Sequence, residues 1–214
     1  MPFFDELQSR TVAERAALLS APAIVECLAG RITQTRYVAF LRQAYHHVKH
    51  TVPLLMACGS RLGEGRAALR SAMTQYIAEE NGHEQWILED LRACGDDADA
   101  AQRAAPAPAT ELLVAYVYDY IARVNPAGFL GMVHVLEGTS SALATRAAHS
   151  IARALGLPPA AFRYLTSHGS LDQEHVVFFA RTVNALEPAD QAHVVHVARR
   201  VYGLYGDIFR GLPA

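Results

Sequence analysis

Hydrophobic and polar positions along this chain follow a helical pattern, and no hairpin dipeptide is flanked by alternating polar and apolar residues. Alanine, leucine and arginine dominate the composition, and runs of β-branched residues are short. These features predict an all-α protein. Glycine and proline divide the pattern into about seven helical segments, whose ends we place from helix start and stop signals.

The predicted helices cover most of the chain. A short N-terminal helical region ends near Gly30, and a longer one over about 33–62 is interrupted or kinked at Pro53. Asn125 and Pro126 supply an N-cap and a first-turn proline for the helix that follows them. The segment DDADAAQRAAPAPA is predicted to be a loop too short to separate domains. Further helices are expected over about 66–94, 110–124, 126–155, 159–186 and 188–209.

Length and charge limit the class of protein. The 214 residues, 51% of them hydrophobic, are predicted to form one domain over 1–214 with a sizeable core. A net charge of −2 with no long basic stretch gives no electrostatic footprint for nucleic acid or an anionic membrane surface. No apolar run approaches the roughly 20 residues that span a bilayer, and we expect no leader segment. Three scattered cysteines predict no disulfide framework, so we expect a cytoplasmic protein.

Histidine is frequent, with ten residues against a single lysine. This raises the question of metal binding, which histidine frequency alone does not answer. Glu80 and His83 are three residues apart in AEENGHEQW, so we expect their side chains side by side, one turn apart on a helix. Glu137, in HVLEGTSSA, follows apolar residues and is expected to face inward.

A third segment places three titratable groups on one helical stripe. In LTSHGSLDQEHVVFF, His168, Asp172 and His175 follow the i, i+4, i+7 rule. Together the three segments offer three carboxylates and three imidazoles, a donor set that suits iron or manganese. Three carboxylates contribute −3 and two divalent ions +4, and a substrate anion can offset the remaining +1. A stripe of salt bridges and satisfied hydrogen bonds is the alternative interpretation.

Glycines lie beside the candidate ligands in all three segments. Gly82, Gly138 and Gly169 would each cost about 1 kcal/mol relative to alanine inside a helix. They indicate local loosening or a close approach of backbones. The Asn81–Gly82 pair is a poor helical pair, so it predicts the softest point of the three.

A ferritin-like scaffold does not fit these motifs. Ferritin-like di-iron bundles use two Glu-x-x-His motifs and a glutamate from each of two other helices. This chain has one such motif, and its second histidine segment reads His-x-x-x-Asp-x-x-His. The segments EENGH, VLEGTSS and SHGSLDQEH instead resemble, in order and approximate separation, the haem-oxygenase-like non-haem di-iron oxidases and oxygenases. Their pattern is most similar to the branch that contains the alkene-forming fatty-acid decarboxylase.

The resemblance implies a fold, a cofactor and an activity. The fold is a haem-oxygenase-like bundle of about seven helices, often a homodimer. The cofactor is a pair of Fe(II) ions, with manganese as an alternative and without haem. The activity is an O₂-dependent oxidation or oxygenation of a small organic acid or amino compound, by oxidative decarboxylation, N-oxygenation or carbon–carbon cleavage. One iron is assigned to Glu80, His83 and His168, and the other to Glu137, Asp172 and His175.

Non-oxidative proteins share the same shape, so the fold does not by itself decide the function. The alternative is a thiaminase-like (TenA-like) hydrolase or a small-molecule-binding regulatory protein, in which the six residues form a hydrogen-bonded polar core. Such hydrolases use a cysteine in the region where this chain reads GFLGMVHVLEGTSSALA, without cysteine. Haem oxygenase proper would offer a proximal histidine on its first helix, and this chain has none before His46.

Three further residues are candidates for the immediate surroundings of the centre. His134 lies three residues before Glu137 and is therefore expected near the metals or in the substrate pocket. Tyr76 and Tyr164 each lie four residues before a candidate ligand and are expected either to donate hydrogen bonds to it or to pack in the core.

Two histidine-rich segments have weaker claims. His46 and His50 share a helix face with neighbouring His47 beside them, and a structural or interface role is expected, with a place in the substrate pocket as the alternative. Asp190 and His193 repeat the three-residue spacing but begin a helix, where an acid is favoured by the helix dipole. We expect a solvated face there.

Overall fold

The computed structural model describes residues 1–167 and 175–214. In this part of the chain there are twelve α-helices, three short 3-10 helices and no strand, which confirms the all-α prediction. The helices outnumber the seven predicted segments because several long segments are broken at glycine or near proline. None of the described helices is long and apolar enough to cross a membrane.

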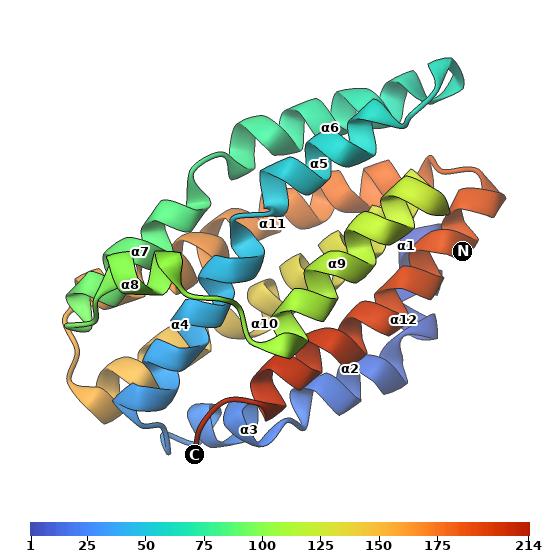
Figure 1. The fold of residues 1–214 in the computed structure, drawn as a ribbon. Coiled ribbons are helices and arrows are strands. Elements are labelled where there is room, and N and C mark those ends of the chain that lie inside the picture. The colour runs from blue at the N-terminus through green and yellow to red at the C-terminus, as the bar shows by residue number, and fades with distance from the viewer.

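Short connections join the helices in chain order (Figure 1). The first are α1 (Phe3–Arg10), α2 (Val12–Leu19), α3 (Pro22–Leu28), α4 (Gln34–Val48) and α5 (Thr51–Ser60). The middle of the chain forms α6 (Ala67–Glu80), α7 (His83–Ala93), α8 (Ala98–Arg103) and α9 (Pro108–Arg123). The last part forms α10 (Phe129–Leu155), α11 (Arg163–Asn184) and α12 (Pro188–Arg210). The 3-10 helices η1 (Glu64–Arg66), η2 (Pro126–Gly128) and η3 (Pro159–Phe162) precede α6, α10 and α11.

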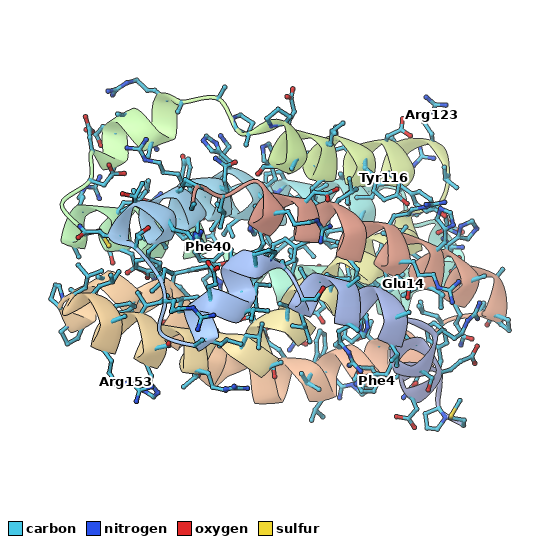
Figure 2. The ribbon with its side chains drawn as sticks, turned by 90° about the horizontal axis from the view of Figure 1, so that it is seen from below. Phe4, Glu14, Phe40, Tyr116, Arg123 and Arg153 are labelled. Carbon is cyan, nitrogen blue, oxygen red and sulfur yellow. The ribbon has the colours of Figure 1, made fainter. Side chains whose placement is uncertain are left out.

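The long helix α10 lies at the centre of the bundle, where it contacts α11, α12, α3, α5 and α9. The N-terminal helices pack along α12, and Figure 2 shows α2 and α12 side by side. Arg199 of α12 holds this pair together, because its guanidinium lies 3.3 Å from Glu14 and donates to the carbonyl oxygen of Arg10 at 2.8 Å. At the opposite side, α5 and α6 form an adjacent pair (Figure 1).

Proline determines where the predicted helix over 33–62 divides. The chain breaks between Val48 and Thr51, before Pro53 rather than at it. A proline ring clashes with the carbonyl group four residues earlier, and here that residue is Lys49. Pro53 itself is the third residue of α5, where the missing N–H leaves no hydrogen bond unmade. The break is therefore a direct consequence of the proline.

The predicted helix over 66–94 is likewise two helices, α6 and α7. Its break falls at Asn81–Gly82, the predicted soft point, and Gly82 has φ +92°. This left-handed conformation is costly for residues with a Cβ, so a glycine is favoured at the junction. Glu80 therefore ends one helix and His83 begins the next.

The predicted loop after Gly95 was wrong in one respect, because it contains α8. Asp97 caps this helix, since its Oδ1 accepts a hydrogen bond from the backbone N–H of Ala100 at 2.9 Å. The predicted N-cap at Asn125 is confirmed, with its Oδ1 accepting from Ala127 N at 2.9 Å. It introduces η2, and α10 follows directly.

The prediction of a solvated face at the start of α12 was wrong. Asp190 is buried there, and its Oδ1 accepts hydrogen bonds from Arg66 at 2.7 Å and from Asn125 Nδ2 at 2.8 Å. His193 is partly buried, with Nδ1 2.7 Å from the hydroxyl of Tyr120. Asp190 thus joins the start of α12 to η1 and to the segment before α10, because a buried carboxylate needs such partners.

Close packing between α10 and α12 depends on Gly131. A Cβ at this position would lie 2.5 Å from the carbonyl oxygen of Val194 and 2.6 Å from the backbone nitrogen of Ala198. Because both neighbours are backbone atoms, no side-chain movement could make room. The glycine therefore sets how closely α12 approaches the central helix.

Candidate metal centre

Three side chains from three different helices converge in the interior. Glu80 of α6, Glu137 of α10 and His175 of α11 each offer a ligand atom, and these atoms all lie within 4.8 Å of one another. Glu80 is 9% exposed and His175 8% exposed, and the Oε2 atom of Glu137 is buried. The structure thus brings together one member from each of the three segments that the sequence singled out.

The Glu-x-x-His motif spans the helix break instead of one helical turn. His83 Nδ1 nevertheless lies 2.9 Å from Glu80 Oε2, and the histidine is 4% exposed. The ring of Trp86 stacks on that of His83 with a centroid distance of 4.0 Å. The guanidinium of Arg163, from α11, lies 5.5 Å from the Trp86 ring. These contacts hold His83 against the centre from the α7 side.

Glu79 belongs to the centre as well, and the sequence reasoning missed it. Its Oε2 lies 3.3 Å from His175 Nε2, and its Oε1 accepts a hydrogen bond from Gln75 Nε2 at 2.9 Å. Neighbouring residues on a helix point about 100° apart, so an inward Glu80 predicts that Glu79 faces elsewhere. The sequence signal that could have identified Glu79 is its place beside Glu80 at the end of the helix. A carboxylate in this place orients the imidazole of His175.

A buried tyrosine lies among these acids. The hydroxyl of Tyr76 has no hydrogen-bond partner among the described residues, and the side chain is 1% exposed. Burial raises the pKa of Tyr76 far above its usual value, and the negative charges of Glu137, Glu79 and Glu80 raise it further. The hydroxyl therefore stays protonated and remains available as a donor.

Two members of the centre, Glu80 and Glu137, line a cavity of about 670 Å³, a volume that includes its open mouth. We call it the metal cavity. Its walls come from α4, α5, α6, α10, α11 and α12. Polar lining residues include Tyr76, Glu80 and Glu137, and apolar ones include Leu55, Phe129 and Leu136. A concave apolar site with a few convergent polar groups is typical of a small-molecule site.

The donor set fits a divalent metal. Carboxylate oxygens and imidazole nitrogens together suit iron or manganese. Glu80 and Glu137 bring two carboxylates close together beside His175, and Glu79 adds a third carboxylate 3.3 Å from the same imidazole. Such a grouping of like charges is costly without compensating cations, and a divalent ion removes that cost.

Two of the six predicted ligands, His168 and Asp172, lie outside the described residues. The other four, Glu80, His83, Glu137 and His175, lie in or beside the metal cavity. Of the predicted surroundings, Tyr76 and Tyr164 line the cavity. The backbone N–H of Tyr164 donates to the buried Asp90 of α7 at 2.9 Å.

His134 lies in an aromatic cluster of the core, not in the lining of the metal cavity. Its ring stacks on Phe179 at 5.9 Å and contacts Phe4 and Tyr202 edge to face. Its Nε2 lies 3.4 Å from Thr11 Oγ1. Burial lowers the pKa of His134 to about 4, with a smaller contribution from Arg15, so the ring is neutral. The structure thus separates this histidine from its neighbour Glu137.

Of the three histidines at the end of α4 and just after it, only one lines the metal cavity. His47 lines the metal cavity. His46 Nδ1 lies 3.3 Å from Lys49 Nζ, and burial, Lys49 and His50 lower the pKa of His46 to about 4. His50 Nδ1 lies 3.2 Å from the hydroxyl of Tyr118. His46 and His50 therefore contact groups outside the cavity lining.

Comparison with known proteins agrees with this arrangement. A family model described as "iron-containing redox enzyme" matches residues 38–206 of the chain. No curated protein sequence matches significantly.

Solved structures show a heme oxygenase-like fold. A domain of unknown function with that fold from Shewanella denitrificans OS217 has a TM-score of 0.86 and 25% identity, covering 98% of this chain and 90% of the other. A TenA homologue from Pseudomonas syringae pv. tomato has a TM-score of 0.80 and 12% identity, covering 97% and 91%. Heme oxygenase from Leptospira interrogans has a TM-score of 0.76 and 16% identity, covering 99% and 100%.

Proposed function

We propose, because this chain belongs to the family of iron-containing redox enzymes, that it is an O₂-dependent non-haem di-iron oxidase or oxygenase. Its substrate class is a small organic acid or amino compound. The observation that carries the proposal is the convergence of Glu80, Glu137 and His175 from three helices to within 4.8 Å. These residue types, which converge beside a cavity with an open mouth, suit iron with open positions for another molecule.

We assign the ligands in two groups. Glu80, His83 and His168 hold one ion, and Glu137, Asp172 and His175 hold the other. Iron(II) bound there supplies the electrons for the reduction of dioxygen. Manganese would suit the same donors. Glu79 positions the imidazole of His175 through the 3.3 Å contact.

The other residues of the cavity bind the substrate and control protons. Tyr76 keeps its proton on the hydroxyl oxygen, since its pKa is raised, and donates a hydrogen bond into the cavity. Leu55, Phe129 and Leu136 supply apolar walls that exclude water from the reacting groups. The chain thus positions the substrate, supplies an uncharged hydrogen-bond donor and keeps water away from the reacting groups.

The chain contains its own reporter for metal binding. Trp86 is its only tryptophan and stacks on His83 at 4.0 Å. Anaerobic titration of the metal-free protein with Fe(II) should therefore quench its fluorescence and reach saturation at about two ions per chain. Metal analysis of the desalted protein measures the same ratio independently.

Variants make the test specific. His175→Ala and Glu137→Ala should each lower bound iron to about one ion per chain or less. His149→Ala, at an exposed position of α10, is the matched control and should keep the wild-type ratio. Loaded wild-type protein should then consume oxygen in the presence of its substrate. Absence of Fe(II) binding, or unchanged iron content in both ligand variants, would contradict the proposal.

The alternative is a non-oxidative hydrolase or a small-molecule-binding regulator. A cysteine-dependent hydrolase needs a thiolate at neutral pH. Burial raises the pKa of Cys27 and of Cys94 to about 11 and that of Cys58 to about 12. None of the three lines the metal cavity. These thiols are protonated at neutral pH, which favours the oxidative proposal.

A further inference from the structure

An aromatic side chain of α7 connects the candidate metal centre to the surface. The ring of Trp86 stacks on that of His83, with 4.0 Å between the ring centroids and 25° between the planes. His83 is 4% exposed, whereas Trp86 is only partly buried. The two residues are three apart in the first turn of α7, a spacing that places them on one side of the helix. A direct ring contact therefore leads from the centre toward solvent.

The outer part of Trp86 lies beside an exposed ion pair. The guanidinium of Arg163 is 5.5 Å from the centroid of the ring and contacts the carboxylate of Glu89. These two side chains are 52% and 48% exposed, and Gln85 on the other side of Trp86 in the sequence is exposed as well. The ion pair carries no net charge. A small polar surface of this kind suits the brief encounters of electron carriers, which bury little area.

The charge of Arg163 indicates the direction in which Trp86 can pass electrons. A cation is attracted to the electron-rich face of an aromatic ring. Loss of an electron from Trp86 would place a second positive charge 5.5 Å from the guanidinium, and the two charges would repel each other. The ring is therefore a poor source of electrons itself. It is better suited to conduct an electron inward from another molecule.

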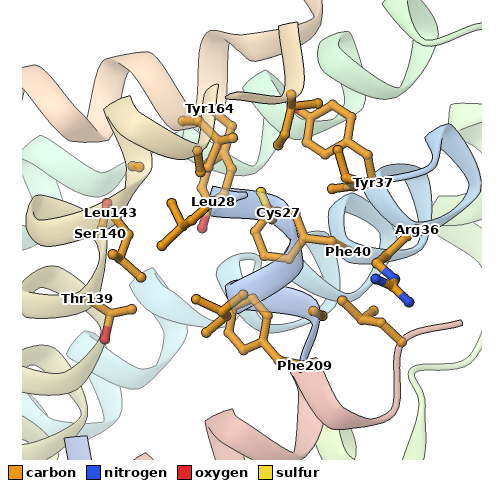
Figure 3. Close-up of a pocket in the computed structure, with 18 of the residues that line it drawn as sticks. Cys27, Leu28, Arg36, Tyr37, Phe40, Thr139, Ser140, Leu143, Tyr164 and Phe209 are labelled. Carbon is orange, nitrogen blue, oxygen red and sulfur yellow. The ribbon is translucent and has the colours of Figure 1, made fainter. Parts of the chain in front are cut away.

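The contact between Trp86 and His83 lies apart from the spaces that a substrate could occupy. One such space is the metal cavity, and a second hollow lies between α3, α4, α10 and the C-terminal part of α12 (Figure 3). Among the described residues, neither Trp86 nor His83 lines either hollow. Tyr76, which lies among the acids of the centre, is 1% exposed and offers no surface to a carrier. Electrons that pass Trp86 therefore reach the centre without competing with the substrate for space.

We infer that Trp86 is the point at which electrons from an external one-electron carrier enter the metal centre. The inference rests on the proposed function, in which His83 holds one of the two irons. After two Fe(II) ions have each given one electron to dioxygen, two molecules of reduced carrier each return one electron through Trp86 and His83. Two Fe(III) ions become two Fe(II) ions and two carrier molecules are oxidised. No bond to Trp86 forms or breaks.

The route can be measured with an electron source attached to the protein. The three native cysteines are buried, so Gln85→Cys supplies one accessible thiol for a photoreducible ruthenium label, two residues from His83. Ala78→Cys on α6 is the matched control, because Ala78 is exposed and lies two residues from Glu80. A laser flash on the iron-loaded, air-oxidised chain under argon, with ascorbate present, turns each label into a one-electron donor. Decay of the ferric absorbance then gives the rate of electron transfer.

The label at position 85 should reduce the centre at least about tenfold faster than the label at position 78 while Trp86 is present. Trp86→Leu should remove this advantage, by slowing transfer from position 85 at least about tenfold and leaving transfer from position 78 unchanged. Trp86→Phe keeps a ring against His83 and should restore most of the lost rate. The comparison of the two labels in the chain that retains Trp86 covers the case in which Trp86→Leu does not fold.

Two results would overturn the inference. One is an equal rate from the two labels while Trp86 is present. The other is equal slowing of both by Trp86→Leu, since a general change in the centre affects both labels alike. Metal analysis distinguishes these failures from failure of the proposed function. Either result with about two irons per chain would contradict the role of Trp86 alone, whereas absence of bound iron would contradict the proposed function and the entry point together.

Discussion

Glu79 Oε2 lies 3.3 Å from His175 Nε2, which joins the end of α6 to α11 beside the candidate metal centre. Gln75, one turn earlier on α6, donates to the other carboxylate oxygen at 2.9 Å. The carboxylate is thus fixed from one side and contacts the imidazole on the other. Such outer contacts set the direction of a histidine ring and strengthen its binding to a metal.

Replacing Glu79 by Gln should weaken metal binding by about 10–100-fold, because the amide keeps the shape but loses the charge that orients His175. The Fe(II) titration followed by Trp86 fluorescence measures this change. Glu111→Gln, at an exposed position of α9, is the matched control and should bind as the wild type does. Wild-type affinity in Glu79→Gln would show that the contact has no role in holding His175.

Two of the three glycines beside candidate ligands, Gly82 and Gly138, should respond in opposite directions to alanine. Gly82→Ala places a Cβ at φ +92° and should lower the free energy of unfolding by about 1–2 kcal/mol. Gly138→Ala lies within α10, where nothing would lie within 4 Å of the new Cβ, and should raise it by about 0.5–1 kcal/mol. Urea unfolding of the metal-free proteins tests both. Effects of the same sign would show that backbone conformation does not govern these positions.

Gly131→Ala should be among the most destabilising single substitutions in α10. The added methyl group meets backbone atoms of α12 at 2.5 Å and 2.6 Å, so the two helices must separate, at a cost of about 1–3 kcal/mol. Gly203→Ala in α12 has open space around its Cβ and serves as the control. Thermal unfolding compares the two. A loss in Gly131→Ala no larger than that of the control would contradict the close approach.

The buried Asp90 should make stability depend on pH. Its carboxylate accepts hydrogen bonds from the backbone N–H groups of Arg163 and Tyr164, yet burial raises its pKa from 3.8 to about 6. The native state then binds more protons than the unfolded state between these values, so this contribution to stability is present below about pH 4 and is lost as the pH rises through about 6.

Asp90→Asn removes this titration. The free energy of unfolding of the wild type minus that of Asp90→Asn should decrease by about 3 kcal/mol between about pH 4 and pH 7, since each pKa unit corresponds to about 1.4 kcal/mol. Urea unfolding across this range measures the difference. The same comparison with Asp99→Asn, at an exposed position of α8, should be nearly flat. A constant difference for Asp90→Asn would rule out the raised pKa.

Local sequence signals indicated two of the helix breaks, near Pro53 and at Asn81–Gly82, because the causes of these breaks are local. Pro53 acts on the carbonyl group of Lys49 whatever surrounds it, and Asn81–Gly82 is a poor helical pair in any fold. The three motif segments were also readable, since helical spacing places Glu80, Glu137 and His175 on faces that can converge.

The remaining features depend on which helices become neighbours, and spacing does not contain that information. His134 is close to Glu137 on α10, but this central helix has neighbours on several sides. Side chains three residues apart on a helix differ in direction by about 60°. On α10 this difference is enough to direct Glu137 to the metal cavity and His134 to Phe179 and Tyr202. The burial of Asp190 could not be predicted from spacing for the same reason, because its partners Arg66 and Asn125 come from distant segments of the sequence.

The origin of Glu80, Glu137 and His175 on three separate helices has a consequence for the lifetime of the protein. An ion bound by all three is held by the native chain and not by the unfolded one. With such an ion bound, native stability would rise with the free metal concentration, by about 2.7 kcal/mol when that concentration is 100 times the dissociation constant. Resistance to proteolysis would then follow iron supply, and starved cells would clear the metal-free chain fastest.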